Sequence, residues 1–229
     1  MDIYFRSGIP RWANTRQAVE QHFIITQDNE FDDEVVVNWG GICYGKNIIN
    51  SNAAVETCSD KIETLRAIGE LAPPWSEEPI FEPPFVASMR VGSRGVGKRR
   101  FRRGIKNPSD WDYFMPFFSS FREYRIITLK TSRRYIIACY EKVRYEGGRI
   151  FRPNWDWTWV KRRDMRQDIK DAALEATRRI NVDLAGVDVI ELPIIEARRY
   201  PRDYFVLEVN SAPGLGEMSA RRIKEKLCE

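Results

Sequence analysis

The sequence predicts an α+β fold, and three observations carry this prediction. Two strand-like runs within residues 123–143 are separated by Thr131-Ser132-Arg133-Arg134, which indicates an antiparallel hairpin. Apolar residues recur at three- and four-residue steps over residues 164–180, the spacing of a helix with one buried face. Two more strands are predicted at residues 184–192 and 204–209.

The N-terminal part predicts a strand and a helix. Val35-Val36-Val37, followed by Asn38-Trp39-Gly40-Gly41, is typical of a buried strand that ends in a turn. Residues 57–70 predict a helix in which Thr57 and Asp60 resemble a capping box. Pro73-Pro74 prevents this helix from continuing.

The middle of the chain predicts short extended segments. Residues 85–91 predict a strand that runs directly into a glycine-rich turn at 92–97, and 99–105 predict extended chain after it. Residues 113–118 are apolar and contain a proline, which favours an edge strand or a connector. The chain closes with a predicted helix over 217–227.

Composition excludes several classes of protein. The chain has 229 residues with 43% hydrophobic residues, too many for a disordered protein. It lacks a long uncharged apolar run and the layout of a signal peptide, so neither a membrane span nor export is expected. None of the four cysteines forms a CxxC pair, which favours reduced thiols and a cytoplasmic location. His22 is the single histidine, so a metal would have oxygen ligands, which favours Mg²⁺.

Acidic and amide side chains gather on the late strands. Glu208 and Asn210 are two residues apart, so they share one face of their strand, and a neighbouring strand can bring Asp188 beside them. Two carboxylates and an amide oxygen suit Mg²⁺ and phosphate. The same spacing also fits a solvated sheet face.

Three other motifs leave alternatives open. The glycines at 92–97 fit a flap over nucleotide phosphates or an ordinary turn, and they form no Walker motif. Five cations within Lys98-Arg99-Arg100-Phe101-Arg102-Arg103 fit a solvated strand or a landing site for an acidic peptide or a nucleic acid. Trp155, Trp157 and Trp159 fit either core packing or stacking on a ring.

These motifs together resemble the ATP-grasp superfamily. The most specific elements are Glu208-Val209-Asn210-Ser211-Ala212-Pro213-Gly214 and the upstream Gly186-Val187-Asp188. They are most similar to the glutamate ligases that modify ribosomal protein, with glutathione synthetase and D-alanine–D-alanine ligase as more distant relatives. Weaker elements follow in the expected order, and together the resemblance covers about residues 59–216: Ser59-Asp60-Lys61, the glycine flap, residues 113–118, Glu123-Tyr124-Arg125 and Phe151-Arg152-Pro153-Asn154.

The resemblance implies roles for individual residues. It assigns Mg²⁺ binding to Asp188, Glu208 and Asn210, and it has Arg152 stabilise the charge that develops during phosphoryl transfer. Lys142, placed by its position alone, is expected to meet an acylphosphate or a carboxylate. The residues expected to contact ATP are Lys61, Arg90, Ser93, Gly95, Phe114, Met115, Glu123 and Asn154.

One of these assignments departs from the family. The family has a lysine on the strand before the flap, and the aligned position here is Ser88. Arg90, two residues further on, is expected on the same strand face and is the candidate to replace that lysine, although its planar guanidinium contacts phosphate differently.

The resemblance implies two α/β lobes whose antiparallel sheets clamp ATP. The expected regions are a shortened N-terminal domain at 1–52, a small lobe at 53–118 and a large lobe at 119–229. The expected reaction is Mg·ATP-dependent joining of a carboxylate and an amine, small molecule or peptide, through an acylphosphate. A kinase on the same fold and a nucleic-acid-binding module that uses residues 98–103 are the alternatives.

Overall fold

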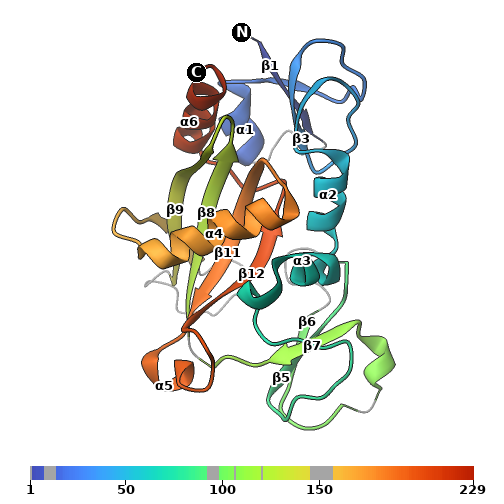
Figure 1. Ribbon diagram of the computed structural model, residues 1–229, viewed down its shortest axis with the longest axis vertical. Helices are drawn as coiled ribbons and strands as arrows, with labels where there is room; N and C mark the ends of the chain where they lie inside the picture. The colour runs from blue at the N-terminus through green and yellow to red at the C-terminus, as the bar shows by residue number, and fades with distance from the viewer. Residues whose placement is uncertain (1, 8–13, 92–97, 106, 120, 145–156) are drawn as a thin grey trace.

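The computed structural model describes residues 2–7, 14–91, 98–105, 107–119, 121–144 and 157–229. These residues form three sheets, with helices packed against them (Figure 1). Two of the sheets are antiparallel, and helices and sheets occur together, as predicted for an α+β fold.

The N-terminal sheet is parallel and has four strands. In sheet order these are β2 (Ile24–Thr26), β1 (Ile3–Ser7), β3 (Val35–Trp39) and β4 (Asn47–Ile49), with α1 (Asn14–Glu20) beside them. The predicted strand at 35–37 is confirmed by β3. Phe5 and Trp39 stack edge to face and belong to the same apolar cluster as Ile127 of the large sheet. The N-terminal segment therefore shares an apolar core with the five-stranded sheet.

The central sheet is antiparallel and has five strands. In sheet order these are β10 (Trp157–Lys161), β9 (Arg134–Arg144), β8 (Arg122–Lys130), β11 (Leu184–Glu191) and β12 (Tyr204–Asn210). The apolar stripe of α4 (Gln167–Ile180) covers one face. The other face packs against α6 (Glu217–Leu227) and β1 at one end, and stays polar in its middle. The predicted hairpin, strands and helices of this region are confirmed.

The third sheet is antiparallel and has three strands, and two single-turn helices belong to the same part of the chain. The strands are β6 (Lys98–Phe101), β5 (Phe85–Ser88) and β7 (Tyr113–Pro116), with the single-turn helices η1 (Gly69–Leu71) and η2 (Pro108–Asp110). The strand β7 lies at the sheet edge, as its proline predicted.

The single helix predicted at residues 57–70 is wrong. The chain forms α2 (Asn52–Ser59) and α3 (Lys61–Ile68), which are separated by Asp60 in an extended conformation. The capping box at Thr57 is also wrong, because Ser51 caps α2 and the Asp60 carboxylate accepts from the N–H groups of Ile62 and Glu63. Asp60 thus starts a second helix rather than completing the first.

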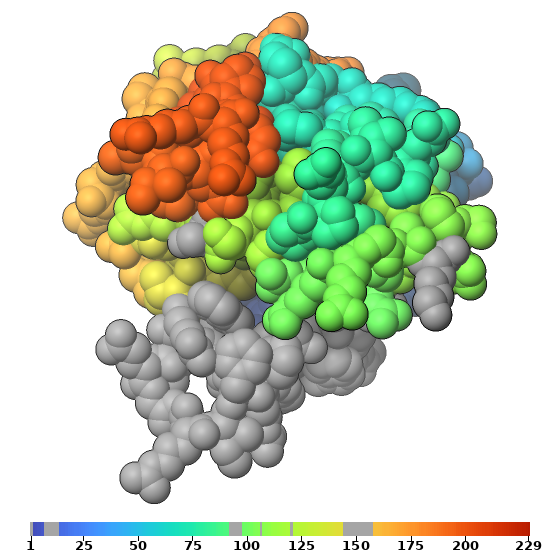
Figure 2. Space-filling view, turned by 90° about the horizontal axis from the view of Figure 1, so that it is seen from below, coloured from blue at the N-terminus to red at the C-terminus, as the bar shows by residue number. Residues whose placement is uncertain are grey.

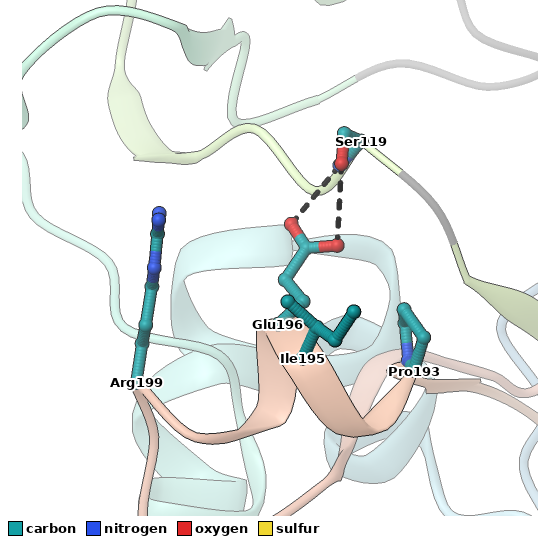
Figure 3. A pocket seen from close by; sticks show the side chains of 5 residues that line it. All are labelled: Ser119, Pro193, Ile195, Glu196 and Arg199. Atoms are coloured by element: carbon teal, nitrogen blue, oxygen red, sulfur yellow. Dashed lines mark hydrogen bonds between the residues drawn. The ribbon is translucent and has the colours of Figure 1, made fainter.

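The connector between β7 and β8 is held by the segment between β11 and β12. Phe118 packs against Tyr200 and Phe205, and both ring pairs have centroids less than 6 Å apart, at 5.6 and 5.9 Å. The N–H and the hydroxyl of Ser119 donate to the carboxylate of Glu196 on α5 (Ile194–Ala197), as Figure 3 shows. The small lobe and α5 thus lie side by side at the lower end of the molecule (Figures 1 and 2).

No helix among the described residues is both long enough and apolar enough to cross a bilayer.

Candidate functional site

Three charged residues form one row across the central sheet. Asp188 on β11 is paired in register with Glu208 on β12 and, on its other side, with Arg125 on β8. Arg125 donates to both carboxylate oxygens of Asp188, from Nε at 2.7 Å and from Nη2 at 2.6 Å. Register partners point to the same face, so Asp188 and Glu208 present their carboxylates together.

Asn210 stands one residue pair further along the same face, opposite Gly186. Its side-chain oxygen accepts the N–H of Ala212 at 2.8 Å, which turns the chain after β12. A Cβ atom at Gly186 would lie 2.7 Å from Cβ of Pro213, closer than real Cβ contacts. Gly186 therefore lets the Pro213 turn pack over β11 and keeps Asn210 near the carboxylates.

The pKa of Glu208 responds to the charges that surround the site. Burial raises the pKa of its carboxyl, and the facing charge of Asp188 raises that pKa further. Lys98, Lys61 and Arg125 oppose this rise without cancelling it. Lys98 and Lys61 belong to the small lobe, so the carboxylates of the large lobe face cations of the small lobe.

A second row, on the small sheet, faces this site. Tyr113 and Lys98 both pair in register with Ser88, so the three side chains share one face. Burial raises the pKa of the Tyr113 hydroxyl, a hydrogen bond with Ser88 opposes this rise, and the charge of Glu208 adds to it. The Ser88 hydroxyl is fully buried, and its contact with Tyr113 lacks the geometry of a normal hydrogen bond.

The donor set fits a divalent cation. Asp188 and Glu208 supply two carboxylates, and Asn210 adds an amide oxygen. Nowhere in the described part of the chain do three or more His, Cys, Asp and Glu residues gather to hold a metal ion, so an ion here needs the amide as its third protein ligand. Burial is the main cause of the raised pKa of Glu208, and the charge of Asp188 adds to it; a cation between the two carboxylates would offset both effects. Mg²⁺ is the ion that these hard oxygen ligands suit.

Glu123 and Lys142 form the next row on the same face. The Lys142 ammonium donates to both carboxylate oxygens of Glu123, at 2.9 and 2.8 Å. The Trp159 ring lies over both rows, with the Arg125 guanidinium 4.7 Å and the Lys142 ammonium 5.8 Å from its centroid. The tryptophan thus covers cations of the site rather than the sheet core.

Two predicted contacts lie elsewhere. Phe114 is 1% exposed in a cluster with Phe85 and Ala87, on the face of β7 opposite to Tyr113 and Met115, so its side chain lies outside the site. The strand β5 ends at Ser88, so Arg90 does not share its strand face. The Arg90 guanidinium instead binds Asp60 at 2.5 Å and Glu63 at 3.1 Å, and it ties β5 to the start of α3.

Of the remaining predicted residues, Lys61 lies at the first turn of α3, where Glu208 acts on it, and Met115 shares the face of Tyr113. Four predicted residues, Ser93, Gly95, Arg152 and Asn154, lie outside the described residues.

Sequence reasoning missed Arg125 and Lys98 as members of the site. The only available signal for Arg125 was the alternation Glu123-Tyr124-Arg125, which places both charges on one strand face. The pairing with Asp188 depends on strand order, which local sequence does not specify.

Comparisons with known proteins show what the sequence and the fold are similar to. A family model of the RimK-like ATP-grasp domain matches residues 118–227. No curated protein sequence matches the chain significantly. Over the matched residues, and in its fold, the chain is similar to the ATP-grasp superfamily.

Solved structures share the fold at low identity. The ATP-grasp ligase PsnB complexed with a minimal precursor matches with a TM-score of 0.59 and 14% identity, over 80% of this chain and 63% of that chain. PsnB with a phosphomimetic precursor variant, Mg and ADP gives 0.54 and 16%, over 82% and 60%. The D-alanine-D-alanine ligase from Coxiella burnetii gives 0.55 and 13%, over 78% and 60%. The chain therefore spans less than two thirds of each of these proteins.

Proposed function

We propose that this protein is an ATP- and Mg²⁺-dependent carboxylate–amine ligase. The observation that carries the proposal is the register pairing of Asp188 with Glu208 on one sheet face, opposite the small-lobe cations Lys61 and Lys98. Carboxylates that hold a divalent cation and amines that hold phosphates are the two halves of a Mg·ATP site. The likeness to PsnB, which is solved with Mg and ADP, supports the same assignment.

The proposed reaction has two steps. A carboxylate oxygen of one substrate attacks the γ-phosphorus of ATP, the bond to the bridging oxygen breaks, and ADP leaves. An amine then attacks the acyl carbon of the acylphosphate, phosphate leaves, and the nitrogen loses a proton to form the amide. Asp188, Glu208 and Asn210 would hold Mg²⁺, which would neutralise part of the phosphate charge.

The protein's own side chains have separate tasks in this proposal. Arg125 orients Asp188 through two hydrogen bonds, and Lys61 at the first turn of α3 offers its ammonium to the phosphates. Lys142, held by Glu123 beside Trp159, offers a cation to the acylphosphate or to the substrate carboxylate. The exposed cations of β6 suit an acidic acceptor.

The test is ADP production by Asp188→Asn and Glu208→Gln variants. The protein is incubated with Mg·ATP, amino acids and acidic peptides, and products are identified by mass spectrometry. We expect both substitutions to abolish turnover while the far-ultraviolet circular dichroism stays unchanged. The control is Glu217→Gln, an exposed carboxylate on α6, which should retain turnover.

Three results would redirect the proposal. Unchanged ADP production in both variants would refute the metal assignment. A stable phosphorylated product that forms without an amine would make the protein a kinase. Salt-sensitive binding of DNA or RNA that survives Asp188→Asn, without ATP turnover, would favour a nucleic-acid-binding module.

A further inference from the structure

The proposed function needs cations at the nucleotide phosphates, and Lys61 at the start of α3 is one candidate. Ser88 ends β5 and is fully buried, so β5 presents no cation at its end. Arg90 is engaged with Asp60 and Glu63, which neutralise it on α3. A phosphate-binding cation must therefore come from another strand.

The register of the small sheet identifies that strand. Lys98 is the residue of β6 directly opposite Ser88, and the two share a face with Tyr113. Neighbouring strands are about 4.8 Å apart, a distance that the four-carbon stem of a lysine can span. The Lys98 ammonium can thus reach the space above Ser88 that a lysine on β5 would occupy.

We propose that Lys98 binds the phosphate groups of the nucleotide together with Lys61. The proposal rests on the proposed function, because it assigns a residue to the same nucleotide site. It replaces the sequence-based expectation that Arg90 performs this task.

Two further observations support this assignment. Lys98 and Lys61 both act on Glu208, and no salt bridge engages either lysine among the described residues. Burial lowers the pKa of Lys61, and the charge of Lys98 lowers it further, so the two ammonium groups repel each other. Two ammonium groups that act on each other and form no salt bridge among the described residues are suited to bind an anion.

The buried hydroxyl of Ser88 adds a polar group to this site. It has no hydrogen bond of normal geometry within the described residues, and it lies between Tyr113 and Lys98. A phosphate oxygen above Ser88 would accept from this hydroxyl and from the Lys98 ammonium. A phosphate group would thus supply the hydrogen-bond partner that the Ser88 hydroxyl lacks.

The next residue of β6 provides a matched control. Arg99 carries the same charge but points to the opposite face of the strand, where its guanidinium lies 5.3 Å from the centroid of Phe101. A general effect of positive charge would involve Arg99 as much as Lys98. A phosphate contact would involve Lys98 alone.

The experiment measures binding of adenosine, ADP and ATP to the full chain by calorimetry, with Mg²⁺ present. We expect Lys98→Ala to weaken ADP and ATP binding by roughly ten- to a hundredfold, the range for a charge-assisted hydrogen bond, and to change adenosine binding by less than about twofold. Arg99→Ala should leave all three affinities within about twofold. Thermal unfolding of each variant checks that it folds.

A variant that moves the ammonium group from β6 to β5 tests more than the loss of a positive charge. Ser88→Lys combined with Lys98→Ser moves the ammonium to β5 on the same face, and it should regain at least part of the lost ADP affinity. If Ser88→Lys/Lys98→Ser does not fold, Lys98→Arg takes its place and should bind ADP more tightly than Lys98→Ala does.

Other outcomes would overturn the proposal. Wild-type ADP affinity in Lys98→Ala, an equal loss in Arg99→Ala, or an equal loss for adenosine would each exclude a phosphate contact by Lys98. Failure of the unchanged protein to bind ADP and ATP would instead overturn the proposed function itself.

Discussion

Asp188 and Glu208 stand directly opposite each other on β11 and β12, while Arg125 binds both oxygens of Asp188 from β8. Asp188 is therefore paired directly with a guanidinium, whereas Glu208 has no such partner and its charge is opposed at longer range by Lys98, Lys61 and Arg125. This asymmetry means that the large lobe alone does not satisfy Glu208. A divalent cation, bound with a phosphate chain between the two lobes, would balance the charge of Glu208.

Removal of Arg125 should destabilise the fold and make it respond to metal. Arg125→Ala leaves Asp188, whose side chain is 11% exposed, without its cation, and we expect a loss of about 3 kcal/mol in the free energy of unfolding. Added Mg²⁺ should raise the melting temperature of this variant more than that of the unchanged protein. Urea unfolding and thermal scans with and without Mg²⁺ measure both effects.

The control for Arg125 is Arg178→Ala, which removes an exposed pair with Glu175 on α4 and should change the free energy of unfolding by less than about 0.5 kcal/mol. An equal loss in the two variants would contradict a special role for Arg125.

Asn50 should stabilise the contact between the N-terminal segment and the strands that carry the site. Its side-chain oxygen accepts the N–H of Asp183 at 2.9 Å and of Leu184 at 2.7 Å, and its amide donates to carbonyl groups that include Ser211. Asn50→Gly keeps the positive φ of 68° but leaves these buried groups unpaired, so we expect a loss of about 2–3 kcal/mol.

Asn50→Ala should lose roughly 1 kcal/mol more than Asn50→Gly, since alanine strains a left-handed backbone. Asn181, with a φ of 57° at the end of α4, is the matched position. Asn181→Gly should change stability little in chemical denaturation, and a loss there equal to that of Asn50→Gly would show that only the backbone matters.

Asp60 should make stability depend on acid pH. Burial raises the pKa of its carboxyl, but hydrogen bonds from Arg90 and from the N–H groups of Glu63 and Ile62 lower it more, so the pKa lies below the ordinary 3.8. A lowered pKa in the folded state means that the stabilisation is complete above the unfolded value and is lost as pH falls through the folded value. Melting temperatures between pH 6 and 2 should show this loss.

Two substitutions separate the roles of Asp60. Asp60→Asn retains a helix cap but removes the charge, so it should flatten the acid dependence. Asp60→Ala also removes the cap and should lower the free energy of unfolding by about 1 kcal/mol near neutral pH. If the melting temperature of Asp60→Asn falls toward acid pH as steeply as that of the unchanged protein, other groups cause the acid sensitivity.

Gly186 should tolerate no side chain. In Gly186→Ala the new Cβ would meet Cβ of Pro213 at 2.7 Å, and moving Pro213 away would cost about 1–3 kcal/mol. Gly104→Ala is the control, because nothing lies within 4 Å of a Cβ at that position. Pro213→Ala in the Gly186→Ala background leaves the clashing Cβ in place, so denaturation of this double variant should show little recovery.

The connector between the lobes should depend on packing more than on its polar contact. Phe118→Ala removes a ring that is 6% exposed and stacked on Phe205, and we expect a loss of about 3–5 kcal/mol. Glu196→Ala removes the exposed acceptor of Ser119 and should cost less than about 1 kcal/mol. Equal losses in urea denaturation would contradict this ranking.

The sequence by itself predicted the elements whose pattern is local. The apolar spacing of α4, the alternation of β12 and the turn between β8 and β9 depend on residues a few positions apart, so they could be read from the chain. The side chains of Glu208 and Asn210 could be placed on one face for the same reason. The break at Asp60 was missed because the same carboxylate can end one helix or begin the next.

Only the tertiary structure decided which strands lie next to each other. Asp188 meets Arg125 and Glu208 because β11 lies between β8 and β12, and Lys98 meets Ser88 because β6 pairs with β5 in one register. A shift of one residue would turn each of these side chains to the other face. Strand order and register are set by packing between distant segments. This is why the sequence suggested Arg90 as the phosphate-binding residue, whereas the folded chain favours Lys98.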